Sequence, residues 1–151
     1  MYWHFESKAH LFQAILDRIR SRWREVVHQP ISARHDPRER LAQLFDSYAD
    51  LFHESPEICL FLQQILLDRH HRQFSAQVAS VFSATARFVA GIIDDGKRTG
   101  TMRRDIQART TAHLILGVLA GATQQASIPG APTLGRLLAA AKAMTLDFVS
   151  R

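Results

Sequence analysis

Apolar residues recur at spacings of three and four along most of the chain, and this periodicity predicts helices rather than strands. The first apolar stripe covers residues 7–28, with Ser7 as the expected cap. We expect Pro30 to end this helix, since proline lacks the N–H that helix continuation requires. A second helix is predicted to begin at Asp36-Pro37, because an acidic cap followed by proline at the first helical position is a strong start signal.

The third and fourth helices follow from similar patterns. Ser55-Pro56 repeats the start signal, and residues 58–67 are apolar nearly all round. A helix of that kind is expected to be buried centrally in the fold. The fourth helix is predicted over about residues 69–95, followed by a loop at 96–100 that contains two glycines.

Two more helices complete the predicted fold. Asp105 is the expected cap of the fifth, which runs to about residue 126, and residues 127–132 form a proline- and glycine-containing loop. Thr133 is the expected cap of a last helix that reaches close to residue 151. The fold class predicted is therefore all-α, a bundle of about six helices.

Composition narrows the cellular setting. A length of 151 residues with 46% hydrophobic content fits one compact domain. The single cysteine, Cys59, excludes an internal disulfide and fits a reducing compartment. The longest apolar run, at residues 114–122, is too short to cross a bilayer, and no signal peptide is visible. We expect a cytoplasmic protein with no membrane partner.

The formal net charge is +5, which by itself does not establish nucleic-acid binding. Arginines at positions 18, 20, 22 and 24 spread around their helix, because alternate residues differ by about 200° in direction. We therefore expect a solvated surface paired with Asp17 and Glu25 rather than one DNA-facing patch.

Signatures of catalysis are missing from the sequence. His70 and His71 are adjacent on a predicted helix and point about 100° apart, so they are poorly placed to chelate a metal together. Asp46 and Asp50 share a helix face, but a two-carboxylate site would need a polar cleft around them. No metal, no cofactor and no enzymatic activity is predicted, and a helical-bundle enzyme is the least favoured class.

The first residues read Tyr2-Trp3-His4-Phe5-Glu6-Ser7-Lys8 and lead directly into the first amphipathic helix. This segment resembles the end of the DNA-recognition helix in transcriptional repressors of the tetracycline-repressor (TetR) family, where aromatic-x-His-Phe-x-Ser-Lys joins the helix-turn-helix head to the sensor body. The resemblance implies a division into residues 1–8, a remnant of the head and its junction, and residues 9–151, an effector-binding and dimerisation domain.

The resemblance also assigns roles to individual residues. Tyr2, His4 and Lys8 are expected to contact the DNA backbone, and Phe5 to pack the head onto the body. By this resemblance Met1 would occupy an interior position of the recognition helix, and we expect the residues that read base edges to be missing from the sequence given. Operator DNA is therefore an expected partner only of an N-terminally complete form, and an upstream start or a truncated product is expected.

A homodimer is predicted from the last two helices. Gly117 and Gly121 lie four residues apart on one helix face and would let another helix approach closely, although a tight contact within the chain explains the spacing equally well. The last helix carries a stripe that is too apolar for a terminal helix facing water. Paired across a two-fold axis, these helices would form a four-helix bundle. Besides the two glycines, the residues predicted at this interface are Leu134, Leu138, Ala141 and Phe148.

A pocket for a small hydrophobic effector is predicted between the central helices, where bulky aromatic side chains leave gaps. For each aromatic taken singly, core packing is the favoured role, and the set forms a pocket only if the bundle is incompletely filled. An alternative for the whole chain is a small all-α protein that binds a hydrophobic ligand or partner helix and has no role on DNA. The predicted pocket residues are Trp23, Phe45, Phe52, Cys59, Phe61, Gln63, Gln64, Phe82, Phe88 and His113.

Overall fold

The computed structural model describes residues 7–150, and this part of the chain contains helices and connecting turns but no strand. A first helical segment is continuous through three labelled elements, and five further helices follow, so the predicted all-α fold of about six helices is confirmed. The elements are α1 (Lys8–Trp23), η1 (Arg24–His28), α2 (Gln29–Ser32), α3 (Pro37–Glu54), α4 (Pro56–Leu67), α5 (Arg72–Thr99), α6 (Ala108–Ala126) and α7 (Leu134–Ser150).

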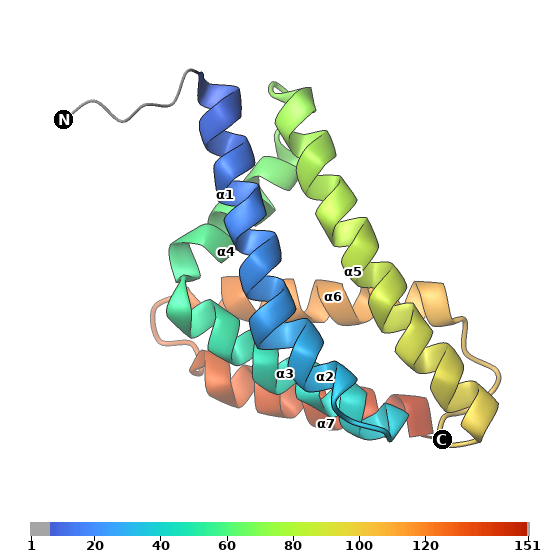
Figure 1. Cartoon of the computed structure of the whole chain (residues 1–151). Coiled ribbons are helices and arrows are strands. Elements are labelled where there is room, and N and C mark those ends of the chain that lie inside the picture. The colour runs from blue at the N-terminus through green and yellow to red at the C-terminus, as the bar shows by residue number, and fades with distance from the viewer. Residues whose placement is uncertain (1–6, 151) are drawn as a thin grey trace.

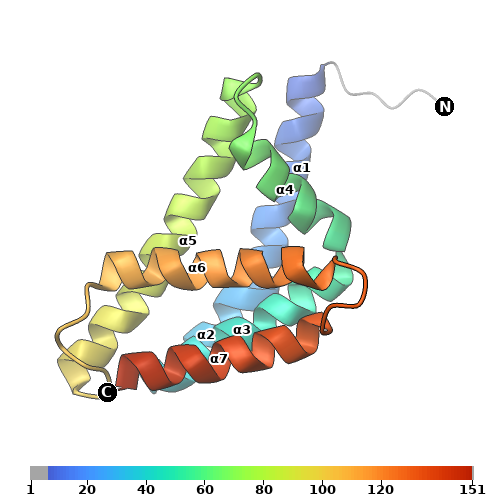
Figure 2. The ribbon, with the colours of Figure 1, turned by 180° about the vertical axis from the view of Figure 1, so that it is seen from behind.

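The helices form an open frame above a packed base (Figure 1). The long helices α1 and α5 extend beyond the base, and α4 joins them near their far ends. Helices α6 and α7 lie side by side across the back of this frame, as the reverse view in Figure 2 shows, and they contact each other along their lengths. The outward face of this α6–α7 layer has no element of the described chain over it.

The main hydrophobic core lies at the base, between η1, α2, α3, α5, α6 and α7. Leu44, Phe45, Ile92 and Leu119 are at most 1% exposed there. A separate group of apolar residues joins the far ends of α1 and α5 to α4, and we call it the distal cluster. Its buried members are Phe12, Leu16, Leu62 and Val78.

The predicted capping residues of three helices are confirmed. Ser7 accepts a hydrogen bond from the backbone N–H of His10 over 3.2 Å, and Asp36 accepts one from Arg38 over 2.7 Å. The Thr133 hydroxyl accepts one from the backbone N–H of Arg136. These bonds satisfy N–H groups that lack a partner inside the first helical turn.

Pro30 does not end the first helix, contrary to the prediction. The chain passes through the π-helical segment η1, where the backbone N–H of Gln29 bonds to the carbonyl of Arg24, five residues back. This wider turn lets Pro30 occupy the start of α2, where a missing N–H costs no helical hydrogen bond. The helix continues to Ser32 as a result.

The prediction that the third helix is buried centrally is also wrong. In α4 only Leu62 is buried, while Phe61 is 38% and Leu67 77% exposed. The helix sits at the side of the frame, so just one part of its circumference meets α3 and α5. Apolar composition alone therefore overestimated its burial.

The loop predicted at residues 96–100 is mostly helix. Gly96 lies inside α5 and is buried beneath Met102, whose Sδ would be 2.5 Å from a Cβ added to this glycine. Only Gly100 adopts the left-handed conformation that ends the helix, with φ of 78°. Asp105 does not cap the next helix either, because it pairs with Arg103, and α6 begins three residues later.

Helix α5 is long and apolar enough by composition to cross a membrane. Its apolar side chains Val89, Ile92 and Ile93 are nevertheless fully buried against the main core. Charged residues such as Arg87 and Asp94 occupy its exposed side. This distribution is typical of a long helix in a bundle.

Candidate ligand-binding cavity

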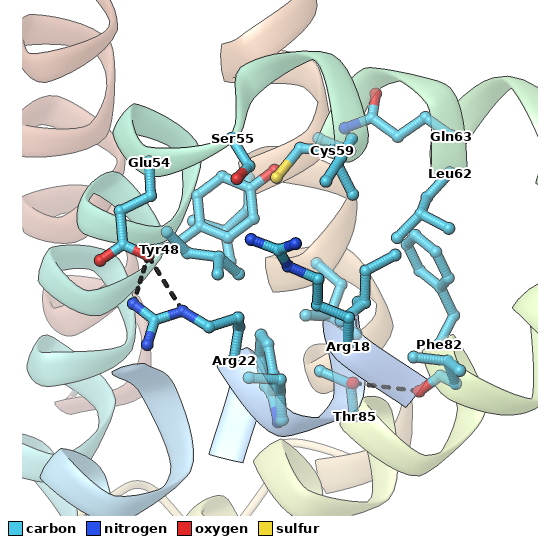
Figure 3. A pocket seen from close by; sticks show the side chains of 18 residues that line it. Arg18, Arg22, Tyr48, Glu54, Ser55, Cys59, Leu62, Gln63, Phe82 and Thr85 are labelled. Carbon is cyan, nitrogen blue, oxygen red and sulfur yellow. Dashed lines mark hydrogen bonds and ion pairs between the residues drawn. The ribbon is translucent and has the colours of Figure 1, made fainter. Parts of the chain in front are cut away.

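A cavity of about 440 Å³ lies between the main core and the distal cluster (Figure 3). Its volume is within the range of roughly 300–1,000 Å³ that small-molecule sites occupy. Side chains from five helices and one connecting residue line it: Arg18, Ile19, Arg22, Trp23, Tyr48, Leu51, Glu54, Ser55, Ile58, Cys59, Leu62, Gln63, Val81, Phe82, Thr85, Leu116, Leu119 and Ala120.

The cavity exists because the two apolar groups of the fold do not merge. The distal cluster holds α1, α4 and α5 together near one end, with the rings of Phe12 and Phe74 4.4 Å apart. The main core holds α3, α5, α6 and α7 at the other end. Leu62 and Phe82 border the cavity from the first group, while Trp23 and Leu119 border it from the second.

Two arginines of α1 line the cavity, one helical turn apart. The Nε of Arg22 donates a hydrogen bond of 3.2 Å to Oε2 of Glu54, at the end of α3. Arg22 also pairs with Glu25, and these carboxylates, Glu54 first, raise the pKa of its guanidinium. Among the described residues, Arg18 forms no hydrogen bond or ion pair, and its guanidinium points into the cavity (Figure 3).

The α1 surface is ion-paired, as predicted, because Arg20 pairs with Asp17 over 3.2 Å and Arg22 with Glu25. The location of Arg18 and Arg22 on the cavity wall was not predicted. The available signal was their spacing of four residues next to the apolar pair Ile19 and Trp23, which places all four on neighbouring parts of one helix face.

A small polar network borders the opposite wall. The amide nitrogen of Gln63 donates to the hydroxyl of Thr123 over 3.2 Å, and Gln124 donates to the oxygen of Gln63. Burial raises the pKa of Tyr48 to about 12, although its hydroxyl's interactions with Thr123 and Gln63 act in the opposite direction. Tyr48 is therefore a neutral hydroxyl at physiological pH, able to donate a hydrogen bond to a ligand.

Cys59 lies beside Tyr48 in the cavity (Figure 3). Burial raises the pKa of its thiol above the usual range, so the thiol stays protonated and weakly nucleophilic. Within residues 7–150, no three histidine, cysteine or acidic side chains are grouped so that they could hold a metal ion. The cavity wall is thus mainly apolar, with a few polar groups, two arginines and one glutamate.

The structure brings together only some of the predicted pocket residues. Trp23, Cys59, Gln63 and Phe82 line the cavity. The others lie elsewhere because their helices turn them away: Phe45 is buried in the main core, Phe52 and Phe88 pack against that core, and Phe61, Gln64 and His113 are exposed. Sequence analysis missed Tyr48, Glu54 and the two arginines.

A second hollow lies on the other side of the seam between α1 and α5. It shares Trp23, Val81 and Thr85 with the first cavity, and the rest of its lining is Arg20, Arg24, His28, Ser80, Ala84 and Phe88. Phe88 forms part of its wall, with its ring 4.6 Å from that of His28. The shared residues show that only one layer of side chains separates the two spaces.

Comparison with known proteins identifies the architecture. Residues 37–142 match the family described as tetracyclin repressor-like, C-terminal domain. The chain belongs to this family. The predicted TetR resemblance is therefore confirmed for the helical body, and the cavity lies in a domain of a regulator family.

Two solved structures share the fold. One is the fatty acid degradation regulator FadR from Bacillus halodurans, with a TM-score of 0.75, 14% identity, and coverage of 91% of this chain and 70% of that one. The other is AibR in complex with isovaleryl coenzyme A and operator DNA, with a TM-score of 0.74, 17% identity, and coverage of 93% and 76%. The comparison with curated proteins finds no match.

The predicted interface residues of this TetR-like domain fall into two groups. Gly117 is exposed, Gly121 is half-buried, and Phe148 is 47% exposed; an added Cβ at either glycine would meet nothing within 4 Å. In contrast, Leu134, Leu138 and Ala141 are at most 8% exposed and pack into the main core of the same chain. The expectation that these three form a surface stripe is therefore corrected.

Other apolar residues of α6 and α7 are exposed instead. On α6, Leu114 is 63% and Val118 44% exposed, and on α7, Met144 is 73% exposed. Together with Gly117, Gly121 and Phe148 they form what we call the α6–α7 face. The exposed apolar residues thus lie on the two predicted helices, but the predicted residues Leu134, Leu138 and Ala141 are not among them. The dimer interface itself stays a prediction.

The expected DNA-backbone contacts lie at the start of the chain. Tyr2 and His4 fall outside the described residues. Lys8 is exposed in the first turn of α1, at the end of that helix farthest from the main core. Its role on DNA remains a prediction.

Proposed function

We propose that this chain is the effector-binding and dimerisation domain of a TetR-like transcriptional regulator. The observation that carries the proposal is the cavity of about 440 Å³ enclosed by five helices of a domain that belongs to this family. Its walls are mainly apolar, as expected for a small, largely hydrophobic effector. The structural relatives are regulators, which favours regulation over enzymatic activity and over a binding protein without a role on DNA.

The helix from α1 to α2 is the proposed connection between the effector and DNA. It contributes Arg18, Ile19, Arg22 and Trp23 to the cavity wall, and its first turn carries Lys8. An effector that displaces this helix would move whatever precedes it, and a dimer would then no longer match two successive major grooves. Residues 1–8 are proposed as the junction to a DNA-reading head, and residues 9–151 as the sensor domain.

We also propose that the chain dimerises through the α6–α7 face. Large exposed side chains such as Leu114, Val118 and Met144 form an apolar surface that no other part of the described chain covers. Two copies related by a two-fold axis would bury these surfaces in a four-helix bundle. Operator DNA is proposed as a partner only of a form with a complete head, and the cytoplasmic location stays a prediction.

A cavity-filling variant tests effector binding. Ala120 lines the cavity, so Ala120→Phe is expected to abolish the binding of a hydrophobic fluorescent dye that the unaltered chain takes up. Ala76→Phe, at an exposed position of α5, is the matched control and should leave dye binding unchanged. Circular dichroism confirms that both variants are folded. Equal dye binding by Ala120→Phe and the unaltered chain would show that the cavity is not the site.

The regulatory role needs a separate experiment on DNA. An N-terminally extended form that carries a helix-turn-helix head should retard DNA from its own upstream region in a gel-shift assay. Addition of a cavity ligand should release that DNA, and the Ala120→Phe variant should not respond. An extended dimer that binds no DNA under any condition would refute the regulatory role.

A further inference from the structure

We infer that the ligand of the cavity is a monoanionic amphiphile, with one negative charge held by Arg18 and an apolar part lying against the cavity walls. The inference rests on the proposed function, because it assumes that the cavity binds the effector. It goes further by naming the chemical class of that effector and the residue that selects it.

The two arginines on the cavity wall are in different electrostatic states. Arg22 is engaged by the carboxylates of Glu54 and Glu25. Arg18 lies one turn earlier on α1 and has no hydrogen-bond or ion-pair partner within residues 7–150. Its guanidinium points to the side of the cavity where Tyr48 and Cys59 lie (Figure 3).

An unpaired guanidinium beside apolar walls favours an anionic ligand for two physical reasons. Arg18 is exposed to solvent on one side, but the apolar side chains on its cavity side exclude part of the water there, so attraction to an opposite charge is stronger in the cavity than on an open surface. The planar guanidinium also donates two parallel hydrogen bonds to a carboxylate. The neutral hydroxyl of Tyr48 supplies a further donor on the wall that Arg18 faces.

The charge balance of the lining limits the ligand to one negative charge. Arg18, Arg22 and Glu54 are the charged residues that line the cavity. Arg22 is neutralised by Glu54 and by Glu25, which lies outside the lining, so the one uncompensated charge of the lining is the positive charge of Arg18. The carboxylate of Glu54 would repel a dianionic group, and Arg18 would repel a cationic group. A neutral alcohol would leave Arg18 without an ion-pair partner. A monocarboxylate with an apolar chain satisfies both the charge and the walls.

Four probes with a chain of eight carbon atoms, counted to include the carboxyl carbon of octanoate, test this inference by calorimetric titration of the full chain. Octanoate is expected to bind at least about tenfold more tightly than octanol, because a hydrogen bond to a charged partner is stronger than one to a neutral partner. Octyl phosphate is expected to bind more weakly than octanoate at a pH where it is a dianion. Octyltrimethylammonium is expected not to bind.

Two substitutions assign the selectivity to named residues. Arg18→Gln should weaken octanoate binding by about tenfold or more and leave octanol binding unchanged, whereas Arg18→Lys should retain the preference for octanoate. Glu54→Gln should tighten octanoate binding and should improve octyl phosphate binding most, because it raises the net charge of the lining. Arg87→Gln, at an exposed position of α5 outside the cavity, is the control.

The possible outcomes separate this inference from the proposed function. Equal affinities for octanoate and octanol, or an unchanged octanoate affinity in Arg18→Gln, would overturn the monoanion assignment while leaving the cavity as a ligand site. Failure of all four probes and of the hydrophobic dye to bind would overturn the proposed function itself. Tight octyl phosphate binding by the unaltered chain would overturn the limit to one charge.

Discussion

A leucine in place of Gly117 is predicted to stabilise the single chain and to weaken the proposed dimer. Gly117 is exposed within α6, and an added side chain would begin in open space, with no atom within 4 Å of its Cβ. Leucine forms helix better than glycine, so Gly117→Leu should raise the free energy of unfolding of the monomer by roughly 0.5–1 kcal/mol.

The same substitution has the opposite effect if α6 packs closely against α6 of a second copy. Each dimer would then contain two inserted leucine side chains, and overpacking costs typically about 1–3 kcal/mol for each. Dimerisation should therefore become less favourable by about 2–6 kcal/mol, which raises the dissociation constant of the dimer by about 30-fold or more.

Sedimentation equilibrium measures the dimer, and urea unfolding at concentrations below its dissociation constant measures the monomer. Gly91→Leu is the matched control, because Gly91 is also an exposed helical glycine with open space around it, but on α5. The control should gain stability and remain dimeric. A Gly117→Leu variant that dimerises as tightly as the control, or an unaltered chain that is strictly monomeric, would refute the proposed interface.

Three further predictions concern stability. Gly96→Ala should lower the free energy of unfolding by about 1 kcal/mol in urea titrations, because the clash with buried Met102 exceeds the gain in helix propensity; an increase would contradict the close contact. The free energy of unfolding should fall as the pH rises from about 10 to about 12, because Tyr48 keeps its proton up to about pH 12 in the folded chain but loses it near pH 10.0 in the unfolded chain. In an ultraviolet titration, the Tyr48→Phe variant should lack the tyrosine ionisation near pH 12. Asp95→Asn should lower the free energy of unfolding by no more than about 1 kcal/mol, because the ion pairs of Asp95 with Arg98 and Arg40 are partly exposed to water. Hydrogen bonds from Arg98 and then Arg40 lower the pKa of Asp95, so this stabilisation is present above pH 3.8 and is lost as the pH falls through the lowered pKa, which acid unfolding of the two proteins would detect.

Local chemistry made the helical fold predictable from the sequence. Apolar periodicity identified the helices, and the side chains of Ser7, Asp36 and Thr133 marked helix starts because they bond to N–H groups a few residues away. Such signals depend on near neighbours in the chain. The family motif at the start of the chain pointed to the same architecture, which the match at residues 37–142 confirms.

Predictions that depended on how side chains and helices pack in the folded structure were less successful. Glycine is typical of loops, but Gly96 lies inside α5, where the side chain of Met102 packs against it. Helix α4 has the composition of a buried helix, but it lies at the side of the frame. Met102 lies only six residues after Gly96, but its contact with Gly96 is not part of the helical periodicity, and the exposure of α4 depends on how little of it meets α3 and α5.

The candidate site shows the same division between local and distant information. The sequence by itself determined that α1 carries arginines and that several helices carry aromatic residues, which made a hydrophobic pocket a reasonable expectation. Only the tertiary structure decided which of them share a cavity. Arg18 and Arg22 line the same cavity as Tyr48 and Glu54, whereas the side chain of Phe45 points into the main core. The physical reason is that a cavity is the space left where two groups of packed side chains fail to meet, and that space depends on the angles between helices, which no local pattern in the chain specifies.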